Sequence, residues 1–177
     1  GVQHNLHASG HLNMERMDTV IGPISVEVVE PLTCLRITVD DNQYGISADL
    51  KFYARTVPIK EPRFTRRIGP RAFMDVTRFT QNGTYEGWIN VKGERIEVNR
   101  EEFLGTRDRS WGIRPIAERD PQPIVPPVSP QFYWLWAPLN FEDKITLYHV
   151  NEDEHGYGWN QSGVICGLGE EQPVQME

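Results

Sequence analysis

The sequence has no long apolar run and no excess of positive charge. No stretch approaches the roughly 18 consecutive apolar residues of a membrane-spanning helix, and the longest run, Phe132–Ala137, is short and aromatic. The chain carries 18 Lys and Arg against 25 Asp and Glu, a net charge of −7. A protein that binds nucleic acid through its phosphates normally presents a basic face. We therefore expect neither a membrane span nor nucleic acid as the main partner.

Cysteine is also scarce. The two cysteines, Cys34 and Cys166, lie too far apart for a CxxC motif and are too few for a disulfide framework. Two buried thiols are typical of a protein from a reducing compartment. The sequence therefore predicts a cytoplasmic location.

Motifs for nucleotide-dependent or metal-dependent chemistry are missing. The sequence contains no phosphate-binding loop, no dinucleotide-binding glycine motif and no nucleophile elbow of a Ser-His-Asp triad. His4, His7 and His11 share a helical spacing, but no array of carboxylates accompanies them. His149 and His155 flank an acidic turn that is more typical of a solvated loop. We expect no cofactor and no metal.

What the sequence does contain is alternation of apolar and polar residues with a period of two. In the clearest run, residues 46–55, Ile46, Leu50 and Phe52 share one face while charged side chains share the other. Turn sequences such as Gln81–Thr84 and Lys92-Gly93 separate such runs. Strands are expected at 24–28, 35–39, 46–55, 85–91, 94–98, 132–141, 144–152 and 159–166.

Evidence for helices is thin. No window keeps the i, i+3, i+4, i+7 stripe of an amphipathic helix, although one helical turn near Arg100–Leu104 is compatible with the sequence. The sequence therefore predicts an all-β, antiparallel fold with short meander connections. We expect more than about 40% of residues in strands and fewer than about 10% in helices, against averages near 20–25% strand.

A proline-rich stretch divides the chain. Residues 115–130 contain six of the 13 prolines, and each proline removes a donor that a central strand would need. We expect a first β-domain at 1–115, an extended connector at 116–130 and the start of a second β-domain at 131–177. A three-stranded remainder rarely makes its own core, so it should pack on the first domain.

The densest group of charged and aromatic residues is Gly105–Arg114. Asp108 lies between Arg107 and Arg109, beside Trp111 and before Arg114, and nearby cations should keep its carboxylate ionised. One interpretation is a buried lock of arginine, aspartate and tryptophan, in which Asp108→Asn would cost roughly 3–5 kcal/mol. The other is the wall of a functional site, in which the substitution would lower activity and leave stability unchanged.

The same ten residues, Gly-Thr-Arg-Asp-Arg-Ser-Trp-Gly-Ile-Arg, resemble a signature of the AttH-like and carotenoid 1,2-hydratase-like superfamily. Glu61–Arg67, Met74–Gln81 and Phe132–Pro138 are also similar to segments of an uncharacterised bacterial branch. The resemblance implies two lipocalin-like, calycin-type β-domains in tandem, each an antiparallel barrel or sandwich. It also implies that this chain is an internal part of a longer protein. Family hydratases protonate an alkene with an acidic residue, for which Asp108 is the nearest candidate by motif.

Two further groups are candidates for binding. Four arginines cluster in Glu61–Arg71, and Arg66 and Arg67 could either lie in a solvated loop or capture a carboxylate or phosphate headgroup. Trp134 and Trp136 share one face of a strand whose other face is also apolar, so we expect it to be covered on both sides. These rings could fill a core or line a ligand cavity.

The leading hypothesis is a protein that binds a hydrophobic small molecule, such as a terpenoid, lipid or polyketide, and acts on it as a hydro-lyase or isomerase. Hydration, dehydration and isomerisation each need a proton donor. Asp108, ringed by arginines, fits better as an orienting residue, and Asp75 is a second candidate. The alternatives are a non-catalytic lipocalin-type carrier, and a half-domain completed by a homodimer or by the missing part of the same protein.

Overall fold

The structure is a computed structural model that describes residues 2–11, 13–114, 133–169 and 171–176. Of these described residues 62% are in strands and none is in a helix, so the all-β prediction is confirmed. All the described strand pairs whose register is known are antiparallel. No helix in the described part of the chain is long and apolar enough to cross a membrane. The lipocalin-like identity of the fold stays a prediction.

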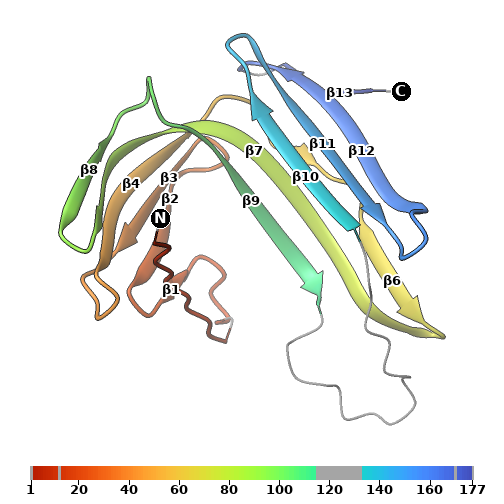
Figure 1. The fold of residues 1–177 in the computed structure, drawn as a ribbon, viewed down its shortest axis with the longest axis horizontal. Helices are drawn as coiled ribbons and strands as arrows, with labels where there is room; N and C mark the ends of the chain where they lie inside the picture. The colour runs from red at the N-terminus through yellow and green to blue at the C-terminus, as the bar shows by residue number, and fades with distance from the viewer. Residues whose placement is uncertain (1, 12, 115–132, 170, 177) are drawn as a thin grey trace. The chain divides into compact units, whose positions relative to one another are not determined.

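Thirteen strands follow one another along the described chain (Figure 1). They are β1 Val20–Ile21, β2 Ile24–Glu30, β3 Cys34–Val39, β4 Ile46–Ala54, β5 Ile59–Lys60, β6 Phe64–Ile68, β7 Arg71–Val91, β8 Glu94–Val98, β9 Leu104–Ile113, β10 Tyr133–Asn140, β11 Lys144–Glu152, β12 Gly158–Gly167 and β13 Val174–Gln175.

The strands form two compact units that interleave in the sequence. The first unit contains Gly1–Arg55 and Gly83–Gly105, and the second contains Thr56–Asn82 and Thr106–Glu177. The long strand β7 runs through the boundary, so its first part belongs to the second unit and its last part to the first. The predicted connector 116–130 lies outside the described residues, and the predicted division around it stays a prediction.

In the first unit, β2, β3 and β4 form a meander that continues onto β7 and β8. Alternation puts Ala48 and Phe52 of β4 in the buried layer, and the Phe52 ring meets Tyr85 edge to face at 5.3 Å. The predicted hairpin at Lys92-Gly93 is confirmed, because both residues have positive φ (53° and 90°) and Val91 pairs with Glu94. Two positive φ angles match the twist that a tight hairpin requires.

The expected turn at Gln81–Thr84 was wrong, because these residues lie inside the continuous strand β7. Gln81, Asn82 and Thr84 are buried rather than exposed to solvent. A Cβ atom on Gly83 would lie 2.3 Å from the Phe52 ring. Tertiary packing against β4 therefore decides the conformation here, and the glycine gives the Phe52 ring room rather than reversing the chain.

The second unit has two packed layers. One layer is formed by β5, β6, β9 and the first part of β7, and the other is the sheet with strand order β10-β11-β12-β13. Ile59 of β5 joins the apolar core supplied by β11 and β12, whose members are Ile145, Leu147, Val164 and Cys166. Cys34 and Cys166 are both buried and free, as expected, and burial raises the pKa of each thiol.

Candidate functional site

Beside this apolar core, the second unit buries a group of polar side chains that we call the Glu61 cluster: Glu61, Arg78, Thr80, Trp136, His149 and Asn160. Strand alternation puts them there. Along β11 every second residue, namely Ile145, Leu147 and His149, is fully buried. His149 therefore lies on the face of the strand that points to the core. Along β7, Val76 and Thr80 are buried and Arg78 lies between them on the same face. The core is thus apolar at one end and polar at the other.

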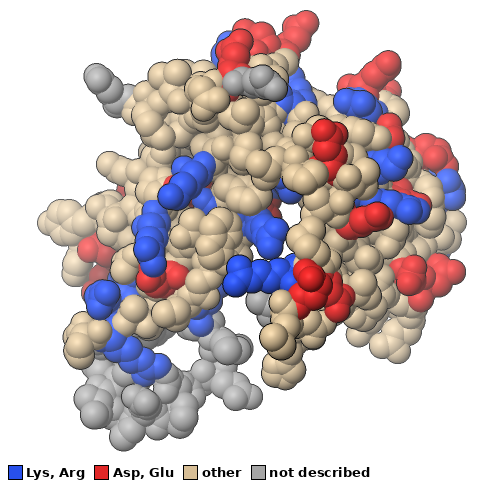
Figure 2. All heavy atoms as spheres, turned by 180° about the vertical axis from the view of Figure 1, so that it is seen from behind, with Lys and Arg blue, Asp and Glu red and all other residues tan. Residues whose placement is uncertain are grey.

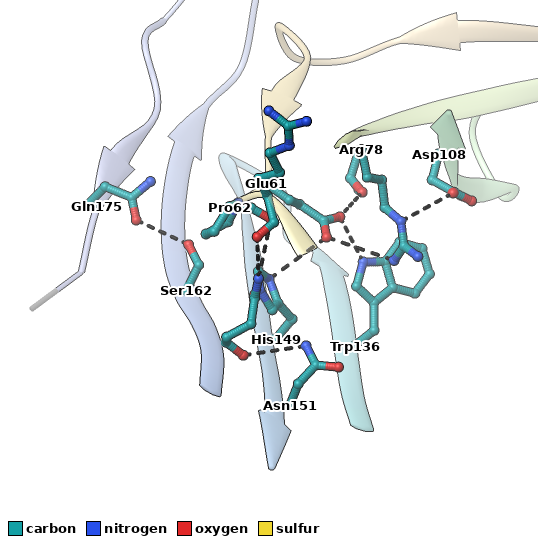
Figure 3. Close-up of polar contacts among 12 residues, drawn as sticks. Glu61, Pro62, Arg78, Asp108, Trp136, His149, Asn151, Ser162 and Gln175 are labelled. Atoms are coloured by element: carbon teal, nitrogen blue, oxygen red, sulfur yellow. Dashed lines mark hydrogen bonds and ion pairs between the residues drawn. The ribbon is translucent and has the colours of Figure 1, made fainter. Parts of the chain in front are cut away.

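Glu61 is the centre of the cluster (Figure 3). Its side chain is 0% exposed. Its Oε1 atom accepts hydrogen bonds from Thr80 Oγ1 at 2.5 Å and from Trp136 Nε1 at 3.1 Å. Its Oε2 atom lies 3.8 Å from Arg78 Nη1 and 3.9 Å from His149 Nδ1, and it has no hydrogen-bond partner among the described residues. Half of a buried carboxylate is therefore unsatisfied.

His149 presents one of its two nitrogens to Glu61. Its Nε2 atom lies 2.7 Å from Asn160 Oδ1, and Asn160 Nδ2 donates to the carbonyl oxygens of Arg63 at 3.0 Å and Pro62 at 3.4 Å. Because a carbonyl oxygen can only accept, the amide nitrogen of Asn160 must face these two carbonyl groups. The amide oxygen of Asn160 then accepts a hydrogen bond from Nε2–H of His149. The Nδ1 atom faces Glu61 and has no hydrogen-bond partner in the described part of the chain.

Arg78 lies between the carboxylates of Glu61 and Asp108 (Figure 3). Its side chain is 11% exposed, with Nη1 near Glu61 and Nε 3.6 Å from Asp108 Oδ2. The guanidinium lies 5.2 Å from the centre of the Phe64 ring and 5.6 Å from that of Trp134. Such cation–π contacts offset part of the cost of burying the charge. Its Nε atom is buried and makes no hydrogen bond to a described residue.

The strand β10 was expected to be covered on both faces, and this is wrong. Tyr133, Trp134 and Leu135, which point alternately to the two faces of the sheet, are 54%, 47% and 37% exposed. The rings of Trp134 and Trp136 stack at 6.5 Å, and Trp136 is half-buried with its indole nitrogen on Glu61. An exposed aromatic surface therefore leads, through Trp136, to the buried carboxylate.

Asp108 is placed differently from the expected buried lock. Its nearest described cation is Arg78 on β7 rather than a neighbour in its own strand, and its side chain is 45% exposed. Arg107 instead donates to Gln81 Oε1 through Nε at 2.9 Å and Nη2 at 2.6 Å. Arg109 and Arg114 are exposed. The exposed ring of Trp111 meets Phe79 at 6.4 Å. Cross-strand neighbours on β7 decide these contacts, which alternation along β9 alone could not specify.

Replacing Asp108 by asparagine should therefore change the free energy of unfolding by less than about 1 kcal/mol, because a partly exposed ion pair contributes little. Urea denaturation of the variant beside the wild-type protein measures this difference. A loss of more than about 3 kcal/mol in the free energy of unfolding would contradict the exposed position and support the interpretation of Asp108 as part of a buried network.

The other predicted acid, Asp75, is held as a carboxylate. Arg63 binds it through Nε at 2.6 Å and Nη2 at 2.7 Å, and Thr65 Oγ1 lies 3.2 Å away. The hydrogen bonds from Arg63 are the largest cause that lowers the pKa of Asp75. A carboxyl group whose charged form is favoured in this way is a poor proton donor near neutral pH.

Two of the four clustered arginines lie on one strand rather than in a loop. Arg66 and Arg67 lie on β6, which pairs with β7, and Arg66 covers the Trp159 ring at 4.6 Å. Arg67 donates to the carbonyl oxygen of Pro70 at 3.2 Å. On the face drawn in Figure 2, Lys and Arg lie among Asp and Glu, and the described residues there form no continuous basic surface. A headgroup role for Arg66 and Arg67 stays a prediction.

Sequence analysis did not select Glu61, Arg78 or His149 as site residues. The one signal available was a histidine in register with two aliphatic residues on β11, which indicates a buried imidazole. Glu61 stood in the arginine cluster, where it looked like part of a solvated charge run. Within the described residues, no group of three or more His, Cys, Asp or Glu side chains could hold a metal ion.

Fold and site together describe an all-β protein with a buried carboxylate–imidazole pair between two layers of its second unit. The chain matches a family of unknown function, DUF8625, over residues 1–176, and it belongs to that family. No curated protein and no solved structure matches it. The resemblance to the AttH-like and carotenoid 1,2-hydratase-like superfamily stays a prediction, as do the cytoplasmic location and the homodimer.

Proposed function

We propose that the second unit binds a hydrophobic small molecule at the Glu61 cluster, and that Glu61 and His149 transfer a proton to and from it. The observation that carries the proposal is the pair of buried atoms Glu61 Oε2 and His149 Nδ1, which lie 3.9 Å apart without hydrogen-bond partners among the described residues. Each unsatisfied buried polar atom costs about 1–3 kcal/mol. Proteins usually satisfy such atoms with water or a ligand.

The surroundings favour a ligand with an apolar body. Phe64 stacks on the His149 ring at 5.7 Å, and the stacked rings of Trp134 and Trp136 connect the cluster to the surface. Flat or branched hydrophobic molecules, such as terpenoids, lipids or polyketides, pack well against such rings. Aromatic faces also stabilise positive charge that develops on a carbon skeleton.

The chemistry available to this pair is proton transfer. In a hydration, an acid delivers a proton to one alkene carbon, the oxygen of water bonds to the other carbon, and a base removes the surplus proton from that oxygen. Dehydration is the reverse. In an isomerisation the acid adds a proton to one alkene carbon and the base removes a proton from a different carbon, so that the double bond moves. A carboxyl group beside an imidazole can perform both proton steps once one of the two holds a proton: that group is the acid, and its deprotonated partner is the base. Asp108 and Asp75 suit the acid role less well, because the first is near the surface and the second is bound by Arg63.

Binding can be tested by tryptophan fluorescence with the unsaturated terpenoid alcohol farnesol as probe. Farnesol should change the emission of the wild-type protein, and Trp134→Ala should weaken its binding by about tenfold while the fold persists, because Trp134 is half exposed. Tyr157→Ala, which removes another exposed ring of the second unit, is the matched control and should bind farnesol like the wild type. An unchanged affinity in the Trp134 variant would contradict the proposed site.

Turnover separates the enzyme from a carrier. Mass spectrometry of farnesol recovered from D2O should show deuterium on carbon with the wild-type protein and none with Glu61→Gln. Binding without deuterium uptake would favour the alternative, a non-catalytic lipocalin-type carrier for the same class of ligand. Native mass spectrometry of the freshly purified protein checks independently for a co-purified lipid or terpenoid.

A further inference from the structure

We infer that the polar group of the ligand is a neutral hydroxyl, which donates its proton between Glu61 Oε2 and His149 Nδ1. The inference rests on the proposed function and specifies the class of ligand within it. It follows from the direction of the hydrogen bonds in the Glu61 cluster rather than from its composition.

The first step is the tautomer of His149. Asn160 Nδ2 donates to two backbone carbonyl groups, so Asn160 Oδ1 can only accept, and Nε2 carries a proton. In the form of the pair that holds no further proton, Nδ1 carries a lone pair and faces Oε2 of the Glu61 carboxylate, 3.9 Å away, which also carries only lone pairs. Two acceptors therefore face each other in a buried space, and neither has a donor among the described residues.

The second step is the kind of donor that fits. A carboxylate ligand would offer only more acceptors and would add a second negative charge next to buried Glu61, whose nearest cation, Arg78, also faces Asp108. An ammonium group would have to lie close to Arg78 Nη1, which is 3.8 Å from the same Oε2 atom. A hydroxyl group is neutral and donates one hydrogen bond. Its own lone pairs are compatible with Arg78 Nη1, which lies 3.8 Å from the same Oε2 atom.

The inference changes the expected headgroup. If Arg66 and Arg67 captured a headgroup, the alternative that the sequence left open, the ligand would be acidic and held at the surface, whereas the buried atoms favour an alcohol. The two expectations differ in their dependence on salt, because binding of an acidic headgroup by exposed arginines weakens as salt rises and binding of an alcohol does not.

The test compares three probes that share one apolar body: farnesol, its methyl ether and farnesoic acid. Fluorescence titration at low and high salt should show farnesol binding at least about tenfold tighter than the ether, because a hydrogen bond to a charged acceptor is lost. Farnesol should also bind tighter than the acid, with no dependence on salt. If no probe binds, the proposed function fails. If the ether or the acid binds as tightly as the alcohol, the proposed function stands and the hydroxyl is overturned.

A variant supplies the missing donor from within the protein. Glu61→Gln keeps an oxygen for Thr80 and Trp136 and places an amide N–H opposite His149 Nδ1, so the preference for farnesol over its ether should fall to less than about threefold. Glu154→Gln is the matched control, since Glu154 also pairs with a histidine, His155 at 3.6 Å, but both are exposed. It should keep the full preference. A preference that survives in a folded Glu61→Gln protein would overturn the inference.

A spectroscopic measurement on the wild-type protein needs no variant to fold. Two-dimensional 1H–15N NMR of the histidine rings should show His149 with the proton on Nε2 and none on Nδ1 in the ligand-free protein. A proton on Nδ1 would mean that the protein provides its own donor and would overturn the inference. On addition of farnesol, the Nδ1 resonance should shift, and the ether should leave it in place.

Discussion

Replacing Glu61 by alanine is expected to lower the free energy of unfolding by about 3–5 kcal/mol, a large part of the stability of a small domain. The change leaves Thr80 and Trp136 without their acceptor and leaves the charge of Arg78, only 11% exposed, without its buried partner. An uncompensated buried charge costs more than a lost hydrogen bond. Urea denaturation followed by circular dichroism measures the difference.

A surface glutamate of the same unit provides the control. Glu154→Ala removes an exposed carboxylate and should change the free energy of unfolding by less than about 0.5 kcal/mol. Glu61→Gln should lie between the two variants, because the amide keeps an acceptor for both donors. The buried pairing would be refuted if Glu61→Ala unfolded at the same urea concentration as Glu154→Ala.

Replacing Gly112 by alanine is expected to destabilise the second unit by about 3–5 kcal/mol. Gly112 has φ of 133°, a conformation that side chains with a Cβ rarely adopt. A Cβ atom there would lie 2.0 Å from the carbonyl oxygen of Asp75 on the paired strand, which is backbone and cannot rotate away. The glycine of the Ser-Trp-Gly sequence is therefore required by the close approach of β9 to β7.

The chain offers a glycine with positive φ but open space as the control. Gly69 has φ of 58°, and nothing lies within 4 Å of the position of its Cβ atom. Gly69→Ala should cost only the strain of the left-handed conformation, about 1 kcal/mol. Thermal and urea unfolding of the two variants should differ clearly. Equal losses would show that steric contact with Asp75 contributes nothing.

Local patterns in the sequence predicted many of the strands. The strands predicted at 24–28, 35–39 and 144–152 correspond to β2, β3 and β11. A strand with one solvent-exposed face must alternate apolar and polar residues, and this alternation is visible in the sequence. The hairpin at Lys92-Gly93 followed from residues that tolerate positive φ. The same reasoning failed at Gln81–Thr84, since a turn-forming composition does not reveal that Gly83 and Thr84 pair with β4 or that the polar residues of the segment are buried.

The candidate site was predicted less well. The motif around Asp108 was selected because its charges are adjacent in the sequence, yet adjacent residues of a strand point to opposite faces. Asp108 contacts Arg78 of the neighbouring strand instead. Asp75 was selected as an acid without knowledge that Arg63 pairs with it across the β6–β7 hairpin. Proton-donor strength depends on such neighbours, which only pairing and register supply.

By itself, the sequence determined the class of the fold, because alternation with period two, frequent Gly and Pro and the absence of helical stripes act locally. It did not place His149, which it put beside a solvated acidic turn, in the buried stripe of β11. Only the tertiary structure decided that Glu61 accepts hydrogen bonds from Thr80, 19 residues on, and from Trp136, 75 residues on. These contacts lie at the polar end of the core of the second unit. Which strand becomes the neighbour of which depends on the packing of whole layers, and no local pattern encodes that choice.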